Sequence, residues 1–182
     1  MASIFVSHSK HDASIVNYFA KIFARTQLQA HLMELENMGN VYAGFRIADI
    51  IRSNWQEDTK AVVVLLGKSL ENPPSPQYTH NWVNFEVGVA AGCKKPVWVF
   101  EGFNEFIKFP IPYVTDYCLY DLESIPHLQY IGETFTKLYV NNQVILPPRR
   151  IKCHLCNAEY NLWSNITCIN CPVCRQHTCG SA

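Results

Sequence analysis

The sequence predicts an α/β fold, in which an open parallel sheet of five strands carries helices on both faces and a small cysteine-rich module follows. Short apolar runs alternate with segments of helical periodicity along most of the chain, which favours a parallel sheet. The runs contain many β-branched residues, as expected for strands that are covered on both faces. Six of the eight cysteines lie in the last thirty residues, which sets the C-terminal module apart.

Five apolar runs are predicted as strands. The clearest reads Ala-Val-Val-Val-Leu-Leu and is typical of a buried parallel strand. In chain order the runs are Ile4–Val6, Leu28–Leu35, Ala61–Leu66, Pro96–Phe100 and Val114–Leu119. Because crossovers between parallel strands are right-handed, few topologies remain, and we expect a flavodoxin-like strand order.

Helices are predicted between these strands. Asp12 and Ser14 are candidate N-caps of the first helix. Its predicted buried face consists of Ile15, Phe19, Ile22 and Phe23. Further helices are expected at 47–55, 82–92 and 125–140. Ligands of such folds bind beyond the carboxyl ends of the strands. That rule selects three segments, 7–12, 34–45 and 67–86.

Charge and hydropathy indicate which binding partners and which cellular location to expect. The formal net charge is zero at neutral pH, which argues against steering toward nucleic acid or an anionic membrane. No N-terminal segment has the pattern of a secretory signal, and no stretch is apolar enough to span a bilayer. The sequence therefore predicts a cytoplasmic protein that binds neither membranes nor, by this measure, nucleic acid.

A domain boundary is predicted at Leu146–Arg150, where two prolines and two arginines end the helical pattern. The composition then changes to cysteine-rich. We expect a first domain at 1–146, a linker at 147–150 and the cysteine-rich module at 151–182.

Two Cys-x2-Cys pairs in this module have the spacing of a structural zinc site. Cys153 and Cys156 form the first pair, and Cys171 and Cys174 follow after fourteen intervening residues. Each pair can bind one ion from a tight turn, and two facing turns complete a tetrahedron. We therefore predict that the cysteine-rich module, residues 151–182, is a zinc ribbon. Four thiolates leave no open position on the metal, so the ion is expected to be structural. A module of about thirty residues has too small a core to fold without such an ion.

Other ligands in the zinc ribbon stay open. Cys168 pairs in register with Cys171, while Cys179, His154 and His177 lie nearby in the sequence. With only two basic residues inside the ribbon, nucleic-acid binding is disfavoured relative to a protein partner or a capping role. A small core between the two turns is expected from Tyr160, Leu162, Trp163 and Ile166.

A candidate catalytic pair lies in the helix that follows the third strand. Trp82 and Glu86 are separated by four positions, which places both side chains on one helical face. Because the preceding strand ends beside the expected ligand crevice, we expect the indole and the carboxylate to point toward it.

Three sequence blocks resemble the Toll/interleukin receptor (TIR) domain family. They are Ile4–Ser9, Val62–Ser69 and Asn81–Phe100, and the most specific feature is the Trp-x3-Glu within the third block. The resemblance covers roughly residues 3–140 and not the zinc ribbon. It identifies the first domain as TIR-like.

The resemblance implies cleavage of NAD between nicotinamide and ribose by a NAD glycohydrolase or cyclase, with Glu86 as the essential carboxylate. It further implies prokaryotic antiviral defence, through NAD depletion or a signal nucleotide, and assembly into homo-oligomers or other TIR–TIR complexes. The residues expected to contact the substrate are Ser7, His8, Ser9, Lys10, Glu34, Phe45 and Trp82.

Physical chemistry agrees with that implication. Nicotinamide is a cationic leaving group that needs no acid, and its departure creates an oxocarbenium-like ribose that a carboxylate can stabilise. Two rival interpretations remain: a non-catalytic TIR scaffold, and an enzyme that resembles nucleoside deoxyribosyltransferases.

Overall fold

The structure is a computed structural model. It describes residues 3–9, 11–25, 29–32, 59–71, 76–102, 106–121, 123–125, 129, 131–133, 148–163 and 168–179. The helix predicted at 47–55 lies outside these residues. Of the helix predicted at 125–140, the described positions 125, 129 and 131–133 are helical.

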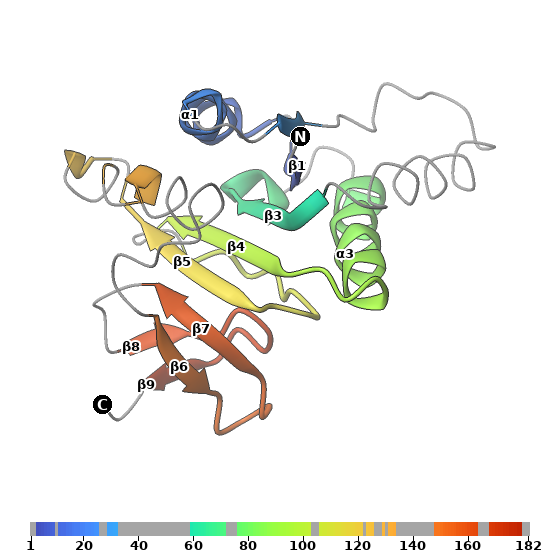
Figure 1. Ribbon diagram of the computed structural model, residues 1–182. Coiled ribbons are helices and arrows are strands. Elements are labelled where there is room, and N and C mark those ends of the chain that lie inside the picture. Colours follow the sequence, from blue (N-terminus) through green and yellow to red (C-terminus); the bar gives the residue numbers. More distant parts are fainter. Residues whose placement is uncertain are drawn as a thin grey trace.

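One mixed sheet of seven strands forms the centre of the molecule (Figure 1). Its members are β1 (Ser3–Ser7), β2 (Gln29–Leu32), β3 (Thr59–Leu66), β4 (Val97–Gly102), β5 (Asp116–Tyr120), β6 (Arg149–Lys152) and β7 (Glu159–Trp163). The strand order is β2-β1-β3-β4-β5-β7-β6, and every pair is parallel except β6 with β7.

The predicted count of five strands is wrong, although five parallel strands in the order 2-1-3-4-5 are present. The difference arises because the first hairpin of the zinc ribbon adds to the edge of β5. Asp116, Tyr117 and Cys118 of β5 pair with Asn161, Leu162 and Trp163 of β7. The zinc ribbon therefore continues the sheet, and its first strand begins inside the segment expected to be a linker.

Helices cover both faces of the sheet, as predicted. On one face α1 (Ala13–Ala24) buries the expected side chains Ile15, Phe19, Ile22 and Phe23 against β-strand residues such as Val63 and Phe100. On the other face α3 (Pro76–Gly92) packs Val83, Val87 and Ala90 against Val62 and Val99. Among the described helices, none is both long and apolar enough to be a candidate membrane span.

The helix α3 begins at Pro76, six positions before the predicted start at Trp82. Proline is well suited to the first turn of a helix, because its fixed φ is helical and its missing N–H would have no partner there. A short 3-10 helix, η2 (Lys68–Leu70), connects the end of β3 toward α3.

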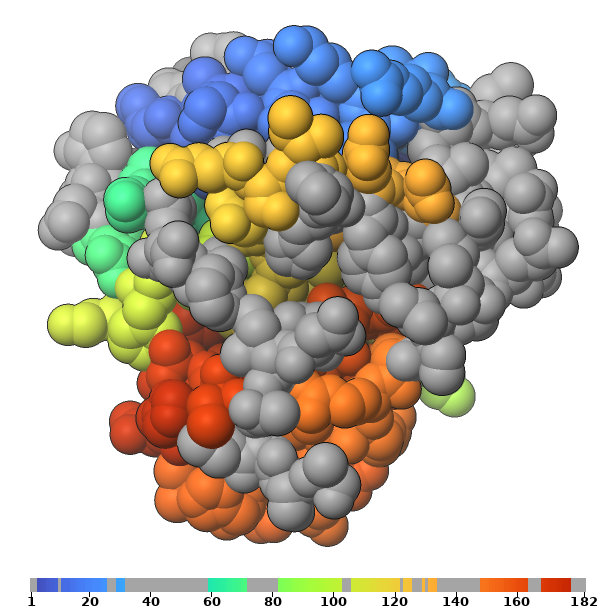
Figure 2. Space-filling model, turned by 90° about the vertical axis from the view of Figure 1, so that its left-hand side faces the viewer, coloured from blue at the N-terminus to red at the C-terminus, as the bar shows by residue number. Residues whose placement is uncertain are grey.

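The zinc ribbon shares the α3 face of the sheet. Ile151, Tyr160 and Leu162 join the same core as Val83 and Val87. A second, two-stranded sheet, β8 (Cys168–Asn170) with β9 (His177–Cys179), completes the ribbon. Figure 2 shows the ribbon at the opposite end of the molecule from the N-terminal residues.

Trp163 does not belong to the core that was predicted between the two turns of the ribbon. Alternation along β7 places Leu162 on the α3 face and Trp163 on the α1 face, where its ring lies 5.2 Å from that of Trp98. This correction has the same cause as the strand count, since a strand inside the sheet is buried on both sides. Ile166 lies outside the described residues.

Candidate active site and metal centre

Glu86 lies on the side of α3 that faces the sheet. Its neighbours Val83, Val87 and Ala90 are buried in the core, and Glu86 itself is 4% exposed. Glutamate is rarely buried to this degree without a specific reason. The helix therefore holds a carboxyl group inside the protein.

Burial raises the pKa of Glu86 to about 8, because the ionised carboxylate loses its hydration. The Ser7 side chain, at the end of β1, lies beside the carboxyl and opposes this shift. Ser7 is itself buried, and its hydroxyl has no partner at regular hydrogen-bond geometry among the described residues. The two side chains form a buried polar pair next to the apolar side chains of α3.

This pair lies where the strand order of the sheet reverses. The chain passes from β1 to β2 on one side and then to β3 on the other side of β1. The loops that follow β1 and β3 diverge at such a point, which is where α/β sheets of this type bind ligands. Ser7 is the last residue of β1, and Gly67 follows the last residue of β3.

The predicted substrate-contacting residues are only partly brought together. His8 is half-buried and Ser9 is buried, directly after Ser7. The Ser9 hydroxyl accepts a hydrogen bond of 3.3 Å from the His11 backbone N–H. Trp82 is half-buried, packs against the core that contains Val87, and meets Phe85 edge to face at 5.8 Å. Lys10, Glu34 and Phe45 lie outside the described residues.

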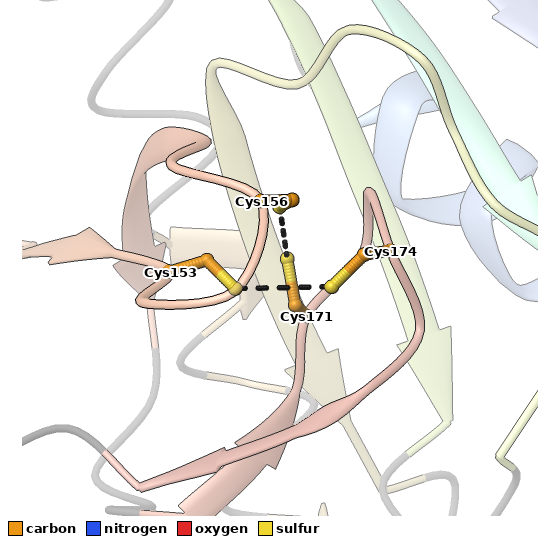
Figure 3. Close-up of side chains that lie close together, drawn as sticks. All are labelled: Cys153, Cys156, Cys171 and Cys174. Carbon is orange, nitrogen blue, oxygen red and sulfur yellow. Dashed lines mark hydrogen bonds between the residues drawn. The ribbon is translucent and has the colours of Figure 1, made fainter.

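The four predicted cysteine ligands converge at one point in the ribbon (Figure 3). All sulfur atoms of Cys153, Cys156, Cys171 and Cys174 lie within 4.8 Å of one another, and two of the pairs, Cys153 with Cys174 and Cys156 with Cys171, are 3.8 Å apart. A tetrahedron with Zn–S bonds of about 2.3 Å has edges of about 3.8 Å. The cluster thus fits a four-coordinate zinc ion.

The two cysteine turns have the same backbone pattern. In the first turn Asn157 N–H donates to the Cys153 carbonyl, and in the second Arg175 N–H donates to the Cys171 carbonyl. Asn157 and Arg175 both have a φ of 59°, a left-handed conformation that closes each turn. Burial opposes ionisation of Cys153, but backbone N–H groups of Cys156 and Leu155 bring its pKa to about 7.

The alternative ligands are separate from the metal cluster. Cys168 is disulfide-bonded and faces Cys179 across the β8–β9 ladder. His154 and His177 are exposed and do not belong to the group of four sulfurs. The pairing of Cys171 with Cys174, rather than with Cys168, is therefore the one that the fold presents to a metal.

A buried ionic network next to the second cysteine turn was not predicted from the sequence. Arg175 forms an ion pair with Glu101 at the end of β4, and Tyr117 donates its hydroxyl proton to the same carboxylate. The Ile107 backbone N–H is a third donor, at 2.8 Å. The guanidinium of Arg175 also lies 4.9 Å from the centre of the Phe106 ring. No local motif signals an ion pair between residues 74 positions apart.

Comparisons with known proteins leave the family open. The sequence matches no protein-family model, and no curated protein is significantly similar to it.

Proposed function

We propose that this chain is a TIR-like NAD glycohydrolase or cyclase in which Glu86 acts on the ribose next to nicotinamide. One observation carries the proposal: a buried carboxyl on α3 lies beside Ser7, at the point of the sheet where the strand order reverses. The flavodoxin-like order of β1 to β5 and the three TIR-like blocks support the same assignment.

Cleavage of the bond to nicotinamide does not require a general acid. The bond between nicotinamide nitrogen and ribose C1′ breaks, its electron pair leaves with neutral nicotinamide, and the ribose becomes oxocarbenium-like. Water, or an internal hydroxyl in a cyclase, then attacks C1′ and releases a proton. An ionised Glu86 stabilises the positive sugar and orients its hydroxyls, and the low-dielectric setting strengthens this interaction.

The loop after β1 supplies a phosphate position in this proposal. It leads from Ser7 into the N-terminus of α1, where backbone N–H groups and the helix dipole favour an anion. The side chain of Asp12, the N-cap residue, makes no capping hydrogen bond to these N–H groups. Trp82 is proposed to line the nicotinamide end of the pocket. A role in antiviral defence through self-assembly is what the family resemblance implies, and the cytoplasmic location remains a prediction from the sequence pattern.

The test is nicotinamide release from NAD by zinc-loaded protein over a range of protein concentrations. We expect release by the wild type and a loss of at least 100-fold in Glu86→Gln, because the neutral amide cannot stabilise a cation. Asn84→Ala, an exposed change on the same helix, is the control and should keep full activity. Equal release by wild type and Glu86→Gln would reject the site.

A wild type that assembles but releases nothing would instead favour a non-catalytic scaffold. Cleavage of nucleosides in preference to NAD would favour the deoxyribosyltransferase-like alternative.

The pH dependence gives a second, independent check. Since burial raises the pKa of Glu86 to about 8, the carboxylate form grows as pH rises. We expect kcat/KM to increase with pH and level off above about 8, because this quantity reports the free enzyme. The bound cationic nicotinamide ring favours the carboxylate, so the midpoint for kcat should lie lower. A rate that falls through this range would indicate an acid role and contradict the mechanism.

A further inference from the structure

Asp12 occupies the N-cap position of α1 but does not cap it. An aspartate there ordinarily accepts a hydrogen bond from a first-turn N–H, which stabilises the helix by about 1 kcal/mol. The helix begins instead with a backbone bond only, from Val16 N–H to the Asp12 carbonyl at 3.1 Å. The Asp12 side chain therefore binds another partner, and α1 lacks the side-chain capping hydrogen bond.

The carboxylate of Asp12 reaches across to the loop that follows β3. Its Oδ1 accepts a hydrogen bond of 3.2 Å from the Ser69 backbone N–H, and its Oδ2 accepts one from the Ser69 hydroxyl. One carboxylate thus binds both donors of a single residue that lies 57 positions away. Hydrogen bonds to an ionised acceptor are the stronger kind.

Gly67 is the residue that permits this approach. A Cβ atom at this position would lie 2.2 Å from Cγ and Oδ2 of Asp12. The φ of Gly67 is −125°, which any residue can adopt, so space rather than backbone conformation requires glycine here. The loops after β1 and β3 are in direct contact at this point.

The two loops are linked to the surroundings of Glu86 in different ways. On one side, Ser7 lies against its carboxyl and leads within five residues to Asp12. On the other side, Leu70 follows Ser69 and packs in the same core as Val83 and Val87, which flank Glu86 on α3. A change at the Asp12–Ser69 contact can therefore affect the Glu86 carboxyl through Ser7 and through the packing of Leu70.

We propose that Asp12 is a positioning residue, which fixes through its hydrogen bonds to Ser69 the spacing between the loop that follows Ser7, the neighbour of Glu86, and the loop that follows β3. This inference rests on the proposed function for its kinetic consequence, but its structural consequence can be measured without turnover. Asp12 touches no reacting atom in this scheme. Asp12 instead holds Ser7 and the η2 turn in an arrangement that shields the Glu86 carboxyl from solvent and fixes its orientation.

The test compares Asp12→Ala, Asp12→Asn and Ser69→Ala with Ser14→Ala, an exposed change in the first turn of the same helix. In the free protein, hydrogen exchange of the Ser69 amide should speed up at least tenfold in Asp12→Ala. The apparent pKa of Glu86, obtained from the pH dependence of stability with and without Glu86→Gln, should move at least one unit toward its ordinary value. Ser14→Ala should change neither.

Kinetics add a readout that a merely structural contact would not move. Asp12→Ala and Ser69→Ala should lower kcat at least tenfold and shift the pH profile, and the double variant should be no worse than either single one. Asp12→Asn keeps an oxygen acceptor and should recover part of the loss. It also keeps the test valid if Asp12→Ala does not fold.

Two negative outcomes are distinguishable. If the wild type releases no nicotinamide, the proposed function fails, and the Ser69 exchange rate and Glu86 titration still decide the role of Asp12. If Asp12→Ala, or Asp12→Asn and Ser69→Ala in its place, leaves the Glu86 titration and the kinetics at wild-type values, the positioning role is overturned, whatever happens to stability.

Discussion

Glu86 makes the stability of the folded chain depend on pH. Its pKa is about 8 in the folded protein, against an ordinary value of 4.5. Below about pH 4.5 the group is protonated in both states, so burial is not penalised by ionisation. Between these values the folded state keeps a proton that the unfolded state releases. Stability contributed by the neutral buried acid is therefore lost as pH rises through the folded pKa.

Glu86→Gln should remove this dependence, since an amide does not ionise. We expect the variant to gain stability relative to the wild type as pH rises from 5 to 8, by at most about 1.4 kcal/mol for each pH unit. Urea unfolding at pH 5, 6.5 and 8 measures the difference, in which the titration of all other groups cancels. A constant difference across the three pH values would mean that Glu86 is solvated in the folded protein.

At the scale of single residues, the spacing in the sequence and the family resemblance made Trp82 and Glu86 candidates, but they did not predict how deeply either side chain is buried. A four-residue separation predicts a shared face and says nothing about depth. The contact of Glu86 with Ser7 joins residues that are 79 positions apart, and it depends on the pairing of β1 with β3. For the same reason Asp12 could be predicted as a helix cap, while its bonds to Ser69 could not.

At the scale of the elements, the end of α3 departs from local preference. Lys94 has a φ of 54°, and it closes the helix through bonds from Lys94 N–H to Ala91 and from Lys95 N–H to Ala90. This is the Schellman arrangement, in which the left-handed residue is usually glycine because a Cβ is strained there. Lys95 compensates in part, since its ammonium group donates to the Thr59 carbonyl at 2.9 Å.

Lys94→Gly should therefore stabilise the protein. Relief of the left-handed strain is worth about 1 kcal/mol, and the exposed Lys94 side chain contributes no contact that the described structure records. The midpoint of chemical unfolding reports the change, and Lys60→Gly, at an exposed strand position, is the opposite control and should destabilise. A decrease in stability for Lys94→Gly would show that the lysine side chain, rather than the backbone, determines this turn.

Within the described residues, periodicity predicted the five parallel strands and the helices α1 and α3, because apolar patterning is a local property. The bounds of α3 were missed by six residues at its start, where the turn chemistry of Pro76 outweighs the polar sequence that follows. Along β7, the alternation of side chains does not predict which face of the strand is buried. Only its pairing with β5 shows why Trp163 is buried on the side opposite Leu162.

At the scale of the whole molecule, the zinc ribbon is joined to the sheet by more than its strands. Asp116 of β5 accepts hydrogen bonds from Trp163 at 2.9 Å and from Asn161 at 3.1 Å. The Ile111 N–H donates to the carbonyl of Pro172, inside the second cysteine turn. These contacts link residues that are far apart in the sequence, which is why cysteine spacing predicted the metal site and not its union with the sheet.

Arg175 adds a buried ion pair to these links. Removing one partner of a buried ion pair leaves the other charge uncompensated, which costs about 3–5 kcal/mol. Arg175→Met should lower the free energy of unfolding by that order, and Glu101→Gln in the same chain should restore part of it. Arg150→Ala breaks an exposed pair with Glu159, and it should cost less than about 1 kcal/mol. Equal effects of the two arginine variants would place Arg175 in contact with solvent.

Removal of the metal should then weaken the sheet as well as the ribbon. A zinc ion held by the four cysteines would fix the two cysteine turns. The second turn includes the left-handed backbone of Arg175, and Arg175 pairs with Glu101 at the end of β4. Native mass spectrometry should find one zinc ion, lost in Cys171→Ser. After chelation we expect the amides of β4 and β5 to lose exchange protection together with those of β7, in one transition at lower temperature. If β4 and β5 stayed protected while the ribbon opened, the ribbon would be an independent appendage, and the ion pair would stabilise only its docking.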